Sequence, residues 1–153
     1  MDVQSYAGPI LVTVACFVLW YGLLLVLQRG TKYRLIAEYA ARGAVFDRYF
    51  GQDAQMLAAD RAVANTHEQM GPFVVSLWLH ARFVSPTTAT ALGAAYVGLR
   101  IAYPFLLGRS LTKTNPKRVF LVTGPCYAII AWLLGGAAYA AIVALGQIGR
   151  AHV

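Results

Sequence analysis

Three polar residues recur at helical spacing in an otherwise apolar part of the chain. Arg61, Asn65 and Glu68 stand at positions i, i+4 and i+7, so a helix places them on one stripe. Polar and charged side chains are expensive to keep inside a membrane helix, where they pair with one another or with a bound polar group. The stripe therefore indicates either a binding site for a polar ligand or a structural ion pair.

A second polar stripe follows on the next apolar segment, where Tyr96, Arg100 and Tyr103 have the same spacing. With a rise of about 1.5 Å per residue in two antiparallel helices, Glu68 and Arg100 lie at matched depth, each roughly 12 Å from one end of its helix. The same count places Asn65 opposite Tyr103, roughly 7.5 Å from those ends. The two stripes are therefore predicted to converge in one half of the bundle.

Pro72 follows the first stripe by one helical turn. A proline inside a helix removes the hydrogen bond to the carbonyl four residues earlier, which here belongs to Glu68. The sequence therefore predicts a bend beside the acid, and a freed carbonyl near a charge is typical of a helix that lines a cavity.

An interhelical ion pair between Glu68 and Arg100 is the plainest alternative to a ligand site. The number of polar groups argues against a pair alone, because Arg61 and the neighbouring polar residues extend the stripes far enough for a zwitterionic ligand. For Tyr96, a packing role is an equally good interpretation.

The composition predicts the elements that carry these stripes. The 153 residues are 59% hydrophobic and 12% charged, whereas soluble domains contain about 25% charged residues. The apolar residues fall in runs near the length that crosses a hydrocarbon layer of roughly 30 Å. We predict an all-α integral membrane protein, a four-transmembrane-helix bundle forming one membrane domain over residues 1–153. The helices are expected at about residues 7–28, 56–83, 87–108 and 119–146.

The connections are predicted from their charge and from the lack of long apolar runs. Residues 29–55 are expected to form an extramembrane loop with short helical pieces lying along the surface, and residues 109–118 a second polar loop. In the third helix, Ala94, Gly98 and Ala102 recur every fourth position, a pattern that favours close helix packing.

Basic residues are distributed unevenly across the chain. Ten of the thirteen Lys and Arg residues fall in residues 29–61 and 109–118. The positive-inside tendency places both loops in the cytoplasm and both termini outside, in a multi-pass protein whose immediate partner is membrane lipid. No nucleic-acid partner is expected, because the cations are divided between loops rather than gathered on one basic face.

Metal binding is not expected. His67 and His80 are thirteen residues apart, too far for a pair of ligands one turn apart on a helix. Cys16 and Cys126 both sit in apolar runs, where they act as small hydrophobic residues.

The segment RAVANTHEQMGPF, residues 61–73, resembles the second-helix signature of the MAPEG family, the membrane-associated proteins in eicosanoid and glutathione metabolism. Its continuation NTHEQMGPFVVSLWL is similar to the bacterial members, which implies a bacterial inner membrane. The resemblance is strongest over residues 60–103, and the length, the helix layout and the charged connections agree elsewhere. It implies a homotrimer that binds glutathione between neighbouring protomers, toward the cytoplasmic face.

The resemblance also implies roles for individual residues. Arg61, Asn65 and Glu68 match the residues of the second helix that bind the tripeptide, and Arg100 and Tyr103 match those of the third helix. Residues that match less closely are the basic residue after the first helix, Arg29, and three candidates for thiolate stabilisation, Lys113, Lys117 and Arg118. A nearby cation favours the thiolate form of the sulfur and so activates it. A further tyrosine of the family falls on Leu107 here.

Three functional hypotheses follow. The first is a glutathione-dependent membrane transferase or peroxidase that acts on a lipophilic small-molecule electrophile entering from the bilayer, with glutathione as co-substrate. The second is a small proton-coupled membrane transporter that uses Glu68 as its titrating carboxylate. The third is a catalytically silent relative that binds lipid or glutathione.

Overall fold

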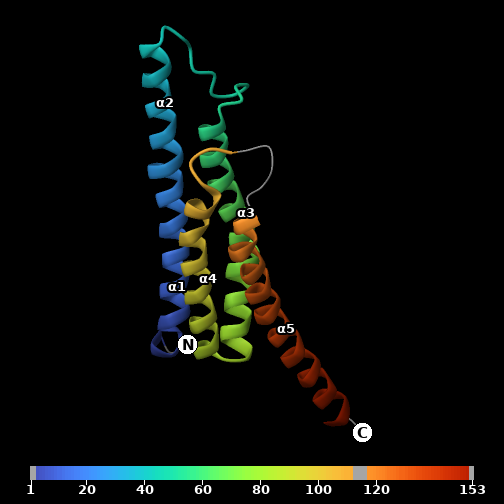
Figure 1. The fold of residues 1–153 in the computed structure, drawn as a ribbon. Helices are drawn as coiled ribbons and strands as arrows, with labels where there is room; N and C mark the ends of the chain where they lie inside the picture. Colours follow the sequence, from blue (N-terminus) through green and yellow to red (C-terminus); the bar gives the residue numbers. More distant parts are fainter. Residues whose placement is uncertain (1–2, 112–116, 152–153) are drawn as a thin grey trace.

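The computed structural model describes residues 3–111 and 117–151, and its first feature is one long helical rod (Figure 1). The rod consists of α1 (Val3–Gly22), a π-helical segment η1 (Leu23–Gln28) and α2 (Arg29–Ala41). The first helix therefore runs beyond its predicted end at Gln28. Residues 29–41, predicted as part of an extramembrane loop with short helical pieces, form one helix continuous with it. The charges of this segment make burial in lipid costly, but they do not prevent it from being helical.

Local contacts explain why the rod continues. Arg34 forms a salt bridge of 2.6 Å with Glu38, one turn further along the same helix. Leu35 is 1% exposed and packs in a small core with Met56 and Ala59 of α3. Burial of this apolar face against a neighbouring helix stabilises α2 outside the membrane.

The remaining helices follow after an irregular connection over residues 42–53. They are α3 (Ala54–Phe83), α4 (Pro86–Leu107), a single 3₁₀ turn η2 (Lys117–Val119) and α5 (Phe120–Ala151). Ser85 caps α4 by accepting a hydrogen bond from the amide of Thr88 at 3.2 Å. The part of the chain that the structure describes contains no strand. The predicted all-helical fold is thus confirmed.

The helices form an elongated bundle in which both termini lie at the same end (Figure 1). Within residues 3–111 and 117–151, three helical segments are long and apolar enough to cross a membrane, namely Val3–Ala41, Pro86–Leu107 and Lys117–Gln147. α3 carries more polar residues and packs against α1, α4 and α5. Its polar positions therefore lie among membrane-crossing neighbours.

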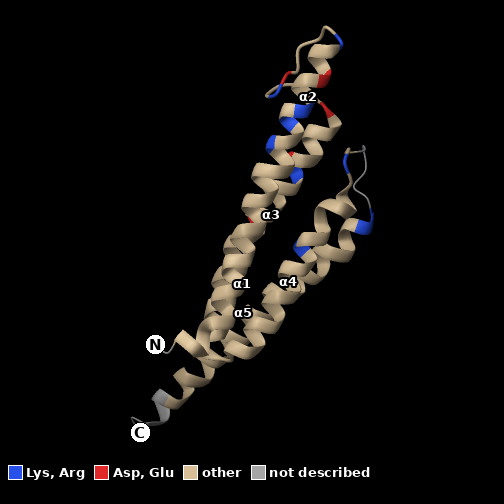
Figure 2. Ribbon diagram, turned by 90° about the vertical axis from the view of Figure 1, so that its left-hand side faces the viewer, with Lys and Arg blue, Asp and Glu red and all other residues tan. Residues whose placement is uncertain are grey.

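Charged residues gather at the end of the bundle opposite the termini (Figure 2). There, both guanidinium nitrogens of Arg48 donate to the carboxylate of Asp60 at 2.9 and 3.0 Å, and Gln28 Nε2 donates to the same group at 2.7 Å. The hydroxyl of Tyr39 donates to Asp53 at 3.0 Å. These bonds hold the rod, the 42–53 connection and the start of α3 together.

α4 packs closely against α1 through a different stripe of small residues from the one predicted. Ala94 and Gly98 are exposed, and nothing lies within 4 Å of a Cβ placed on Gly98. Ala89 is fully buried instead, and a Cβ on Gly93 would stand 2.7 Å from Val12 of α1. Both stripes have the same four-residue spacing, so spacing alone did not identify the one that meets a neighbour.

Gly136 is predicted to be the small residue on which the packing of α5 against α3 depends. A Cβ on Gly136 would stand 2.7 Å from the ring of His80 in α3. That ring is held in place, because its Nδ1–H donates to the carbonyl of Leu133 at 3.1 Å. A Cβ on Gly135 would meet nothing within 4 Å. Gly136→Ala should lower the free energy of unfolding by about 1–3 kcal/mol through overpacking. The matched Gly135→Ala should raise it by up to about 1 kcal/mol through helix propensity. Thermal unfolding in detergent measures both, and equal shifts would contradict the tight approach.

Asp53 is predicted to make stability depend on pH. Burial works to raise the pKa of Asp53, but hydrogen bonds from the amides of Met56 and Gln55 and from the Tyr39 hydroxyl outweigh it and hold the pKa below its usual value. The stabilisation is therefore present above about pH 4 and is lost as the pH falls through the lower folded-state pKa. Asp53→Ala should cost about 1 kcal/mol at neutral pH through loss of the helix cap.

Asp53→Asn is the matched control, because it keeps a capping oxygen but does not titrate. Unfolding temperatures measured from pH 7 down to pH 3 should fall less steeply for this variant than for the unmodified protein. Parallel curves would show that Asp53 does not carry the dependence.

Candidate functional site

The site is built around Arg100, a charged residue in α4 that is only 1% exposed. Its Nη1 donates a hydrogen bond of 2.8 Å to the side-chain oxygen of Asn65 on α3. The guanidinium carbon lies 5.5 Å from the ring centroid of Tyr96 and 5.4 Å from that of Tyr103. The structure thus brings together all three residues of the second predicted stripe, Tyr96, Arg100 and Tyr103, with Asn65 of the first.

The predicted pairing of Arg100 with Glu68 is not observed. Ion pairs in the described part of the chain join Arg34 to Glu38 and Arg48 to Asp60, and Glu68 is exposed. Depth along the two helices was matched correctly, but a position three residues after Asn65 is rotated by about 60° around the helix at 3.6 residues per turn. Asn65, rather than the acid, faces Arg100.

Arg100 retains unused hydrogen-bonding capacity. Its Nε and Nη2 and the hydroxyl of Tyr96 are buried and make no hydrogen bond within the described residues. Both polar atoms of the side-chain amide of Gln69, one turn beyond Asn65, are likewise buried and make no hydrogen bond within the described residues. Buried donors without partners cost free energy, so this cluster favours a polar or anionic group, including water, close by. Gln69 was not among the predicted site residues, although its i+4 spacing from Asn65 places it on the same helix face.

Tyr96 combines a packing role with its place in the cluster. Its ring stacks on Phe73 of α3 with a centroid separation of 3.7 Å and an interplanar angle of 8°. Both side chains are almost fully buried. α3 continues as a helix through Pro72 directly before this contact. The stack therefore fixes α3 against α4 just beside Arg100.

Arg61 and Glu68 lie on the outside of the helical bundle. Glu68 borders a shallow recess whose other walls include Phe17 and Val74. Both charged groups, like Arg100, are nevertheless within electrostatic reach of the Tyr103 hydroxyl. Tyr103 thus connects the buried cluster to the charged outer face of α3.

The other cations predicted for the site do not join the cluster around Arg100. Arg29 is exposed on the rod, with its guanidinium 5.6 Å from the ring of Tyr33. Lys117 is exposed in η2, whereas Lys113 lies outside the described residues. Arg118 reaches back to the end of α4, where its Nη2 stands 3.6 Å from the Cβ position of Gly108. The structure therefore brings Arg118, but not Arg29, toward the C-terminal end of the helix that carries Arg100.

No group of three potential metal ligands of the His, Cys, Asp or Glu type occurs among residues 3–111 and 117–151. The site consists of arginine, amide and phenol groups, which are suited to carboxylate and amide ligands. Arg is the residue that recognises carboxylates most specifically, because its planar fork matches the two carboxylate oxygens.

Fold and site together define an α-helical integral membrane protein with a polar cluster buried between two of its helices. The model of the MAPEG family matches residues 7–145, nearly the whole chain. The chain belongs to the MAPEG family, and the predicted resemblance is confirmed. It is accordingly a membrane protein of the group connected with glutathione or eicosanoid metabolism. Comparison with curated proteins gives no match.

Arg100 and Asn65 are predicted to be energetically coupled through their hydrogen bond, so that the effect of changing one depends on the presence of the other. Asn65→Leu should lower the free energy of unfolding by about 1–3 kcal/mol, because it leaves Nη1 of the buried guanidinium without its acceptor. In an Arg100→Met background, where the side chain is apolar and of similar length, the same change should cost much less. The free energy of unfolding in detergent, without added ligand, is measured for the unmodified protein, the two single variants and the double variant. An equal penalty in both backgrounds would show that the bond contributes no coupling.

Proposed function

We propose that this protein is a glutathione-dependent membrane transferase or peroxidase that acts on a lipophilic electrophile. Membership of the MAPEG family supports the glutathione connection. One observation carries the proposal further: charged Arg61 and Glu68 lie exposed on the outside of an apolar bundle, next to a buried arginine that has donors to spare. The arrangement suits a small ligand that carries both signs of charge.

The exposed charges also support assembly as a homotrimer. Glu68 lies fourteen residues into the 30-residue α3, roughly 21 Å from its start, so it is near the middle of the helix. A carboxylate facing lipid at such a position is costly. A second protomer that covers this face, with glutathione held between the two, would remove both charges from lipid. We therefore place the glutathione site between protomers.

The ligand groups can be assigned by charge. Glu68 would bind the ammonium group of glutathione, and Arg61 would bind a carboxylate. Asn65 and Tyr103 would bind amide or carboxylate groups. Arg100, whose Nε and Nη2 make no hydrogen bond within the described residues, would bind the second carboxylate where the ligand reaches into the cluster.

Activation of the thiol is assigned to the second polar connection. Arg118 is the strongest candidate, since its guanidinium lies at the end of α4, beyond Tyr103. Lys117 and Lys113 are the alternatives for this role. Arg29 is instead a further candidate for binding glutathione. A cation near the sulfur stabilises the thiolate. In a transferase, the thiolate forms a C–S bond with the electrophilic carbon while a leaving group such as halide departs with the bonding electrons. In a peroxidase, it attacks the peroxide oxygen and the O–O bond breaks, which gives glutathione sulfenic acid and an alkoxide that takes up a proton; a second glutathione then condenses with the sulfenic acid to give the disulfide and water. The thiol proton passes to solvent.

The charge distribution supports an orientation for the bundle. The end that carries the clustered Lys and Arg residues (Figure 2) would face the cytoplasm, and both termini would lie on the other side of a bacterial inner membrane. Glutathione is then taken from the cytoplasm, and the lipophilic co-substrate from the bilayer.

One observation favours a second candidate, a proton-coupled transporter. Glu68 is exposed and makes no salt bridge within the described residues, so no arginine of its own protomer holds it ionised by direct contact. A carboxylate beside an apolar recess in a membrane helix is also the chemistry that a proton-coupled carrier needs.

Glutathione binding separates these candidates. Isothermal titration of the purified oligomer should show binding at millimolar ligand or below. Arg61→Gln and Glu68→Gln should each weaken the affinity about tenfold or more, since each removes a charge-assisted hydrogen bond worth about 1.5–3 kcal/mol. Arg82→Gln, which removes an exposed cation at the other end of α3, should leave the affinity unchanged.

The absence of any heat of binding at millimolar glutathione would overturn the proposal. In that case, pH-dependent uptake into proteoliposomes that is abolished by Glu68→Gln would identify the transporter. Binding without turnover of chlorodinitrobenzene or of a lipid hydroperoxide would instead identify a catalytically silent relative. If turnover occurs, Arg118→Gln should reduce it more than it reduces binding.

A further inference from the structure

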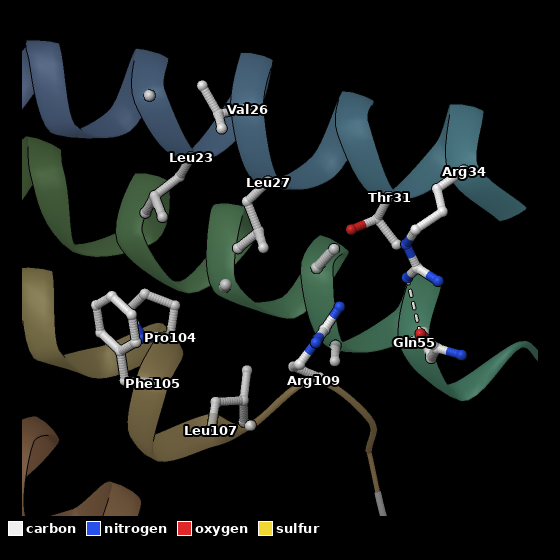
Figure 3. A pocket seen from close by; sticks show the side chains of 15 residues that line it. Leu23, Val26, Leu27, Thr31, Arg34, Gln55, Pro104, Phe105, Leu107 and Arg109 are labelled. Atoms are coloured by element: carbon white, nitrogen blue, oxygen red, sulfur yellow. Dashed lines mark hydrogen bonds between the residues drawn. The ribbon is translucent and has the colours of Figure 1, made fainter.

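A cavity separate from the proposed glutathione site lies within one chain, between η1, the first turns of α2 and α3, and the end of α4 (Figure 3). Its volume is about 460 Å³, within the range of about 300–1,000 Å³ usual for small-molecule sites. None of the residues assigned above to glutathione lines it. Its lining on α3 includes Gln55, Ala58 and Ala62. At 3.6 residues per turn, these positions are rotated around the helix by about 100° on average from Arg61 and Glu68.

The two ends of this cavity differ in chemistry. Leu23, Leu27 and Phe105 gather at one end, and Thr31 and Arg109 stand at the other (Figure 3). An apolar end and a polar, cationic end within one cavity match an amphiphilic ligand.

The positive charge at the polar end comes chiefly from Arg109. Arg34 also borders the cavity, but it forms a salt bridge with Glu38 at 2.6 Å and donates to Gln55 at 2.7 Å. Arg109 directly follows the end of α4, and the amide of Leu111 donates to the carbonyl of Ala54 at 3.0 Å. This bond holds the connection across the start of α3, so Arg109 is kept over the cavity.

The apolar end opens toward the side of the bundle. Val26 and Phe105, which flank it, are 77% and 78% exposed. The wall that contains Val26 is the π-helical segment, a widened turn that occurs often at functional sites. A hydrocarbon chain held in the cavity can therefore continue outward between these two side chains into lipid.

We propose that this cavity binds an anionic amphiphile, with its phosphate or carboxylate on Arg109 and its hydrocarbon tail leaving between Val26 and Phe105. Thr31 supplies a hydroxyl beside the head group. The cavity lies where the apolar helices give way to the charged connections, which is the level of lipid head groups. The ligand is distinct from glutathione, and no residue assigned to glutathione or to its thiol lines the cavity, although Arg118 stands beside the cavity wall at Gly108. The inference therefore goes beyond the proposed function.

Native mass spectrometry of the full-length protein in detergent tests this proposal. The protein is mixed with phosphatidylglycerol, phosphatidylcholine or palmitate, and the lipid retained on the oligomer is measured. We expect an anionic lipid to be retained over phosphatidylcholine, and Arg109→Gln to lower its retention about fivefold, the factor that one cation contributes to attraction of anionic lipid. Arg82→Gln is the control for charge and should change nothing.

A second variant tests the tail. Val26→Trp adds bulk at an exposed position, so it should not disturb folding, and it should reduce retention of the anionic lipid by narrowing the exit. Preferential retention of phosphatidylglycerol would identify a phospholipid as the ligand, and preferential retention of palmitate would identify a free carboxylate. Glutathione affinity and unfolding temperature should be unchanged in both variants.

Two results would overturn the proposal. One is equal retention of phosphatidylglycerol by the unmodified protein, Arg109→Gln and Val26→Trp. The other is an equal loss in Arg109→Gln and Arg82→Gln, which would indicate general attraction of head groups to surface charge. Neither depends on whether the protein binds glutathione, so failure here and failure of the proposed function can be told apart.

Discussion

The buried guanidinium of Arg100 is the constraint on which the arrangement of this bundle depends. A charge inside a membrane protein must be satisfied by neighbouring groups, and here Asn65 of α3 and the faces of two tyrosines surround it. These contacts fix α3 against α4 in depth and in rotation. The stacking of Tyr96 on Phe73 makes the same junction rigid with apolar surface. Tyr103 then lies where it can interact with both the buried cluster and the charged outer face of α3.

A second set of polar contacts shapes the end of the bundle away from the termini. Asp60 joins the rod, the 42–53 connection and α3 through Gln28 and Arg48, and Asp53 caps α3 while binding Tyr39. Because these contacts keep α2 beside α3, the cavity below Arg109 has walls on three sides. α3 consequently presents two different faces: Arg61 and Glu68 are exposed on one, and Gln55, Ala58 and Ala62 line the internal cavity on the other.

Differences between prediction and structure arise from rotation about helix axes and from helix length. Residue counting placed Glu68 and Arg100 at matched depth, but it did not resolve the rotation of about 60° that puts Asn65 in contact instead. The same limitation applied to the small residues of α4, where two stripes have equal spacing and only the one with Ala89 and Gly93 meets α1. The helix over residues 29–41 was missed because its stability comes from Leu35 packing on α3, a contact far away in sequence.

The amino-acid sequence by itself determined the membrane-embedded helical class, the polar stripe of α3, the arginine of α4 and the family, because hydropathy, helical spacing and a local motif are properties of neighbouring residues. The tertiary structure decided which polar group pairs with Arg100, that Glu68 and Arg61 face outward, and that Arg109 stands over a cavity with an apolar exit. These features depend on the rotation of each helix about its axis and on contacts between distant segments. Such contacts form only when the helices pack.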